Sequence, residues 1–192
     1  MSKILVDTID TRSGTSTLTL GSSNLTTLNK ASGVTANFGK IGQVIYAQTT
    51  TQSQSTSTSY ATTGFSASIT PTSTSSKILV DFNIHYQIFG NNADSNFGGN
   101  FKIVRTVSST DTDVFSEANP TPRLYNTHSG SAYLFSSYNL TELDEPSTTS
   151  ACTYTIHSRV RDNGATTNNR ISLSQDNAIS SVTLMEVLAW AH

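Results

Sequence analysis

Clustered acidic residues are the side chains of this sequence that could carry out chemistry. Asp111, Asp113 and Glu117 offer oxygen ligands of the kind that calcium binds, and so does the asparagine-rich stretch 91–96. Asp-Thr-Asp lacks the remaining ligand positions of a calcium-binding loop. We therefore expect both clusters to be solvated turns.

A second acidic cluster contains Glu142, Asp144 and Glu145. Paired carboxylates carry out glycoside hydrolysis, but only when the two carboxyl groups face one another across a cleft. Neighbours in one acidic turn, which we expect around Pro146, rarely meet that condition. We predict no catalytic residues, no cofactor and no enzymatic activity.

The cysteine and the histidines are scattered. Cys152 is the only cysteine, and a nucleophilic role would need a histidine beside it. Its neighbours 151–156 alternate like a strand, which favours a buried structural thiol. His85, His128 and His157 form no ligand set within one chain. Three copies of one outward-facing histidine could bind a metal on the axis of a trimer, which the sequence leaves open.

Composition excludes several classes of partner. Only 12% of the 192 residues are charged and the net charge is -2, without a cluster of lysine and arginine. We therefore predict no nucleic-acid binding. The sequence has no basic amphipathic helix, no apolar run of membrane-spanning length and no signal-peptide pattern, so we expect synthesis in the host cytoplasm and no membrane insertion.

The longest clean alternation runs through residues 77–89, where apolar residues from Val80 to Ile88 alternate with polar ones. This period of two predicts a strand with one buried and one wetter face. Further strands are expected at 43–48, 60–69, 97–107, 114–115, 132–140, 151–160, 170–173 and 179–188. Residues 49–59 are expected to be an exposed loop or a polar edge, and residues 117–130 an irregular loop. The spacing predicts an all-β, antiparallel, jelly-roll-like β-sandwich.

The chain divides near Gly39–Gly42 into an N-terminal segment, 1–40, and a β-sandwich domain, 41–192. The N-terminal segment has short extended β-like pieces but few apolar residues, too few for a monomer to fold. Association of identical chains would remedy this, and a disordered tail is the alternative.

Several segments carry a resemblance to a known family. The chain resembles the C-terminal β-domain of tailed-bacteriophage virion proteins, especially the fibre proteins of marine phages, and its beginning is similar to their N-terminal attachment segments. The matching segments are GQVIY at 42–46, SYATTGF at 59–65, ITPTSTSSKILV at 69–80, SVTLMEV at 181–187, and, in the attachment segment, KILVDTI at 3–9, GT at 14–15 and LTL at 18–20.

The resemblance implies a homotrimeric virion structural protein. Its N-terminal segment would dock to other virion proteins, and its distal sandwich, of tumour-necrosis-factor or C1q-like type, would face the host. The chain lacks a long repetitive shaft, so a short tail fibre that attaches to the host surface is the leading interpretation. A head fibre, a decoration protein or a tail adaptor without receptor binding is the alternative, and a glycan-degrading tailspike is a third.

Three groups of residues are candidates for contacts. Loop aromatics beside polar residues suit a host glycan or protein receptor. Polar residues on one side of the 77–89 strand suit the trimer interface, and we expect Trp190 in the core or at an interface. The receptor candidates are Phe97, Tyr125, Asn126 and His128; the trimer candidates are Asp81, Asn83, His85 and Gln87; the virion-attachment candidates are Ile4, Leu5, Val6, Ile9, Leu18 and Leu20.

Overall fold

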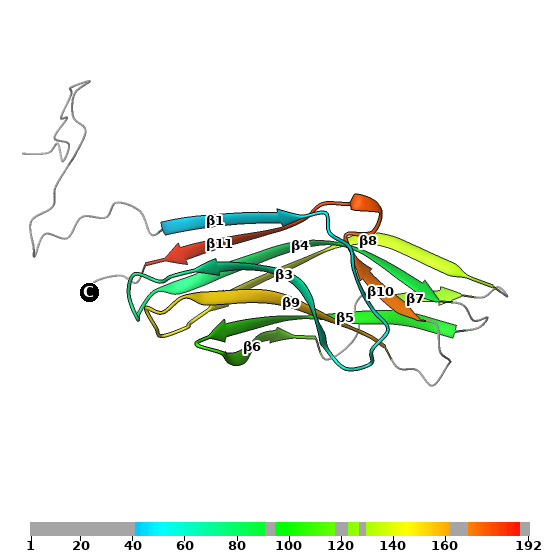
Figure 1. The fold of residues 1–192 in the computed structure, drawn as a ribbon, viewed down its shortest axis with the longest axis horizontal. Coiled ribbons are helices and arrows are strands. Elements are labelled where there is room, and N and C mark those ends of the chain that lie inside the picture. Colours follow the sequence, from blue (N-terminus) through cyan, green and yellow to red (C-terminus); the bar gives the residue numbers. More distant parts are fainter. Residues whose placement is uncertain (1–40, 91–94, 118–122, 127–129, 162–168, 189–192) are drawn as a thin grey trace, which may run out of the picture. The chain divides into compact units, whose positions relative to one another are not determined.

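The computed structural model describes residues 41–90, 95–117, 123–126, 130–161 and 169–188. These residues form eleven strands and one 3-10 helix (Figure 1). The elements are β1 (Ile41–Thr49), β2 (Ser53–Ser55), β3 (Ala61–Ile69), β4 (Lys77–Gly90), β5 (Ser95–Val107), β6 (Thr110–Ser116), β7 (Arg123–Asn126), β8 (Ala132–Asp144), β9 (Cys152–Val160), β10 (Arg170–Leu173), η1 (Gln175–Asn177) and β11 (Ser180–Val187).

The strands make two antiparallel sheets. In sheet A, β1, β11, β4 and β8 lie side by side, and β10 and β2 continue the sheet next to the second half of β4. In sheet B, β3, β9, β5 and β6 lie side by side, and β7 pairs with the beginning of β5. Figure 1 shows β1, β11 and β4 along one layer and β9, β5 and β6 along the other.

The pairing of the eight main strands is nested. The first pairs with the last (β1 with β11), the second with the seventh (β3 with β9), the third with the sixth (β4 with β8) and the fourth with the fifth (β5 with β6). This arrangement is that of a hairpin folded over on itself, which is the jelly roll. The predicted fold class is therefore confirmed for the described residues.

The core lies between the sheets, where the predicted alternation places it. The side chains of β4 from Val80 to Ile88 that were predicted to be apolar and inward-facing are buried, and so is the inward row of β9 from Cys152 to Val160. Edge-on aromatic contacts join the layers, since the Phe65 and Phe82 rings lie 5.8 Å apart. Burial of this one face per strand is the main source of stability.

The polar stretch 49–59 contains the short strand β2 at the edge of sheet A, which agrees with the expected polar edge. Three expectations about strand boundaries were wrong. The stretch 117–130 contains β7, which pairs with β5. β6 is longer than residues 114–115, and β8 continues to Asp144, through part of the expected acidic turn. In each case pairing with another strand imposes an extended conformation that the local sequence does not demand.

Phe97 does not lie in an exposed loop, and its assignment as a receptor contact was wrong. It belongs to β5 and is fully buried. Its ring lies against the backbone of Gly90, where a Cβ atom would come within 2.3 Å of the ring carbons. The last residue of β4 must therefore be glycine to accommodate this ring.

Candidate functional site

The outer face of sheet A carries most of the exposed apolar side chains of the described residues. One straight row crosses four strands, because the register places Val44 opposite Met185, Met185 opposite Leu79, and Leu79 opposite Leu143. We call these four residues the apolar row. Val44 and Leu143, at its two ends, are 54% and 50% exposed. Contiguous apolar surface of this kind marks an interaction site on a soluble protein.

Polar side chains occupy the middle of the same face. Thr141 Oγ1 and Asn139 Nδ2 donate hydrogen bonds to Asp81 Oδ1, at 2.6 Å and 3.1 Å. His85 lies two outward-facing positions beyond Asp81 on β4, and its ring nitrogens are 3.3 Å from Ser137 Oγ. The cross-strand network fixes these side chains in place. The face therefore combines an apolar end with an ordered polar centre.

The four predicted trimer-interface residues differ in their exposure to solvent. Asp81, Asn83 and His85 do lie on the outer face of sheet A, and the last two are exposed. Gln87 is only 3% exposed within one protomer, so its assignment as an accessible interface residue was wrong. Whether the other three contact a second chain stays a prediction.

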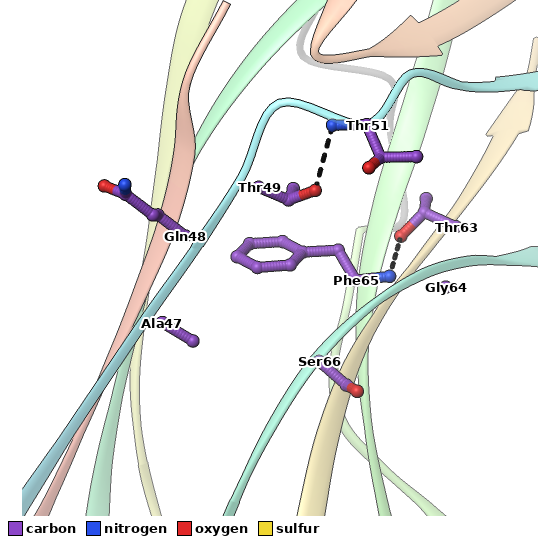
Figure 2. Close-up of a pocket in the computed structure, with 8 residues that line it drawn as sticks. All are labelled: Ala47, Gln48, Thr49, Thr51, Thr63, Gly64, Phe65 and Ser66. Carbon is purple, nitrogen blue, oxygen red and sulfur yellow. Dashed lines mark hydrogen bonds between the residues drawn. The ribbon is translucent and has the colours of Figure 1, made fainter.

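A lateral cleft of about 310 Å³ opens between the edge strands β1 and β3. Figure 2 shows the Phe65 ring directed from β3 toward β1, with threonine hydroxyl groups around it. A bulge in β3 shapes the cleft, since the five residues from Thr62 to Ser66 lie opposite only three residues of β9, and Gly64 has a φ of 78°. The lining residues are Ala47, Gln48, Thr49, Thr51, Thr63, Gly64, Phe65 and Ser66. None of them is charged, so this cleft offers no acid or base for catalysis.

Among the remaining predicted receptor contacts, the structure describes the side chain of Tyr125 alone. Tyr125, in β7, is 60% exposed, so its accessibility agrees with the prediction, but nothing tests its role. The Asn126 side chain and His128 lie outside the described residues, as do Trp190 and the six virion-attachment candidates.

The carboxylates weighed as calcium ligands have separate protein partners. Asp111 Oδ1 accepts a hydrogen bond from Thr106 at 2.7 Å, and Asp113 lies 2.8 Å from Lys102 Nζ. Glu117 is buried, where Phe101 N–H and the Tyr138 hydroxyl donate to it. The described residues contain no group of three metal-ligating side chains. The expectation of a solvated turn was wrong for Glu117.

Asp144 and Cys152 form part of one buried network. Both oxygens of Asp144 lie 2.6 Å from Arg105 Nη1, and the Tyr154 hydroxyl donates to Oδ2 at 2.7 Å. Asp144 is thus an inter-strand anchor and not a member of an acidic turn. Burial raises the pKa of the Cys152 thiol, which keeps it protonated and agrees with the predicted buried structural cysteine.

Glu186 is a buried carboxylate with a perturbed pKa that the sequence interpretation missed. It lies on the inner face of β11, fully buried, where the backbone N–H and hydroxyl of Thr72 donate to Oε1 at 2.6 and 2.7 Å. Gln43 Nε2 donates to Oε2 at 2.9 Å. Burial on its own raises the pKa of Glu186, but the hydrogen bonds led by Thr72 outweigh it and lower the pKa to about 2. The sequence did contain a signal for this site, because the alternation of residues 181–187 places the charged Glu186 on the inward-facing side of the strand.

Comparison with known proteins gives distant structural similarity alone. No protein-family model matches the sequence, and no curated protein matches it. Solved structures with similarity include the infectious bursal disease virus VP2 subviral particle, at 12% identity and a TM-score of 0.37, covering 77% of this chain and 37% of that chain. The T13 particle of the same virus has 13% identity and a TM-score of 0.39, covering 85% and 40%.

The chain spans about two fifths of the length of these solved structures. Because one fold hosts many functions, similarity at this level carries no functional argument. Among the described residues, no helix is long and apolar enough to cross a membrane.

Proposed function

We propose that this chain is a virion structural protein of a tailed bacteriophage, a short homotrimeric tail fibre that attaches to the host surface. Support comes from the sequence segments that resemble phage fibre domains and from the nested jelly-roll pairing that those segments adopt. Residues 1–40 would then dock to other virion proteins, through the apolar positions between Ile4 and Leu20.

The observation that carries the proposal is the apolar row on the outer face of sheet A. Val44 and Leu143 stay about half exposed in one chain, at the two edges of the sheet. Burial of such a row between identical chains removes apolar surface from water at about 25 cal/mol per Å². Asp81, which follows Leu79 on the same face, would fix the orientation of the contact.

We expect the purified protein to have three times the 20.6 kDa mass of one chain in multi-angle light scattering. Leu143→Asp should shift it to the mass of one chain, because a charge at an exposed position of the apolar row opposes burial. Thr112→Asp adds the same charge at an exposed position of β6 in sheet B and should leave the trimer intact. A folded monomer for the unmodified protein would contradict the trimer.

Competition for adsorption tests the attachment role. Purified protein added to host cells before the phage should reduce adsorption in proportion to its concentration. Leu143→Asp should need at least about a hundredfold higher concentration, because a monomer loses the avidity of three linked sites. A head decoration or a tail adaptor predicts unchanged adsorption at every concentration, so that result would favour the alternative role.

A further inference from the structure

Two exposed aromatic rings are stacked nearly parallel to one another at the other end of the sheet A face. Tyr133 and Phe135, two residues apart on the edge strand β8, are 52% and 56% exposed. Their ring centroids are 6.5 Å apart and their planes differ by only 15°. We call this pair the aromatic platform. Phe89, opposite Tyr133 on β4, packs beside it, since its ring lies 4.9 Å from the Tyr133 ring and contacts the Arg170 guanidinium at 4.1 Å.

A pocket of about 240 Å³ adjoins the platform, and Phe135 belongs to both. The pocket lies between β4, β8 and the turn around η1. Its lining residues are His85, Tyr86, Phe135, Ser136, Gln175, Asp176 and Ala178. An imidazole, a hydroxyl, an amide and a carboxylate therefore surround one aromatic ring. Gln175 Nε2 donates to Asp176 Oδ1 at 2.9 Å, which holds the amide and the carboxylate together.

The turn around η1 is held in an uncommon conformation. Ser174, Asp176 and Asn177 have φ angles of 50°, 57° and 62°, in the left-handed region that non-glycine residues rarely occupy. Hydrogen bonds to β4 fix the turn, because Ser174 N–H donates to the His85 carbonyl at 2.8 Å and His85 N–H donates to Ser180 Oγ at 3.0 Å. Strain of this kind is concentrated at functional sites, where it preorganises side chains.

We propose that the aromatic platform and this pocket together form a binding site for a host-surface glycan. The proposal rests on the attachment function proposed above and names the ligand class and the residues of that site. A sugar ring has an apolar C–H face that fits Tyr133 and Phe135, and a polar edge whose hydroxyl groups fit Asp176 and Gln175. The two nearly parallel rings, two residues apart, offer contacts for consecutive sugar units along β8.

A second copy of this chain is the competing occupant of the platform. An apolar protein surface laid over it would also cover the Asp176 carboxylate, which is exposed and has no lysine or arginine among the described residues of the pocket. Burying a carboxylate that has no charged partner, and only the Gln175 amide as a hydrogen-bond donor, is costly. Sugar hydroxyl groups donate hydrogen bonds to it and avoid that cost, so the site favours a glycan.

Binding of the full-length protein to a microarray of bacterial lipopolysaccharides and capsular polysaccharides tests the site. We expect binding to at least one polysaccharide. Phe135→Ala and Asp176→Ala should each weaken it at least about tenfold. Tyr125→Ala removes an equally exposed aromatic ring in sheet B and should leave the binding unchanged. Thermal unfolding of each variant confirms that it is folded.

Each other outcome overturns the glycan site. Loss of binding in Tyr125→Ala but not in Phe135→Ala would place the receptor contact on β7. A Phe135→Ala variant that becomes monomeric would identify the platform as a contact between copies. Absence of binding to every polysaccharide would also reject the site, while the trimer mass and the adsorption assay would still report separately on the proposed function.

Discussion

Replacing Asp144 with alanine should lower the free energy of unfolding by about 3–5 kcal/mol. Asp144 accepts hydrogen bonds from Arg105 and from the fully buried Tyr154, and the Arg105 and Asp144 side chains are only 14% and 11% exposed. Alanine would leave a guanidinium and a hydroxyl without their partner inside the protein. The cost of those unpaired groups exceeds the value of the ion pair itself.

Urea-induced unfolding of the variants measures this effect. Glu145→Ala is the matched control, because it breaks an ion pair with Lys77 at the surface. The Lys77 and Glu145 side chains are 44% and 65% exposed, so we expect the free energy of unfolding to change by less than about 1 kcal/mol. The double variant Arg105→Met/Asp144→Leu should recover much of the loss, since it removes both charges. A loss below about 1 kcal/mol in Asp144→Ala would show that Arg105 finds another partner.

Glu186 should make stability depend on pH in the acidic range. Its pKa is about 2 in the folded protein and 4.5 ordinarily, so the unfolded chain takes up a proton at a higher pH than the folded one. The stabilisation is therefore complete above pH 4.5 and is lost as the pH falls from about 4.5 to about 2. The difference corresponds to about 3 kcal/mol.

Glu186→Gln tests this directly. The amide cannot carry the charge that Thr72 stabilises, and its NH2 group would face the Gln43 amide donor. We expect the variant to be less stable than the unmodified protein by up to about 3 kcal/mol at pH 7, with the two converging near pH 2. Glu145→Gln, at an exposed site, should keep the pH profile of the unmodified protein. If the free energy of unfolding of Glu186→Gln and of the unmodified protein changed with pH in parallel, Glu186 would not be the source of the pH dependence.

The alternation of apolar and polar residues was sufficient to predict the architecture. Val80 to Ile88 and Cys152 to Val160 alternate over nine residues each, and the structure buries the predicted side of both strands. Period-two burial depends only on neighbours along one strand, so a single sequence records it. The same reasoning correctly predicted Cys152 to be buried.

The composition of the exposed surface sites depends on the register between strands that are distant in the chain. A single sequence does not show this register. Leu79 and Leu143 are 64 positions apart, yet they lie directly opposite each other on the exposed face. Phe97 looked like a loop aromatic until pairing placed it against Gly90. Asp144 looked like a turn residue because its partner Arg105 lies on another sheet.

The sequence by itself therefore determined the main strands, such as β4 and β9, and which side of each is buried, but not the short strands β2 and β7. Only the tertiary structure decided that Val44, Met185, Leu79 and Leu143 make one row, and that Phe135 meets Asp176 at one pocket. The physical reason is that alternation is a local property of each strand, whereas a surface site is made by several strands whose register is fixed by the packing of the whole core.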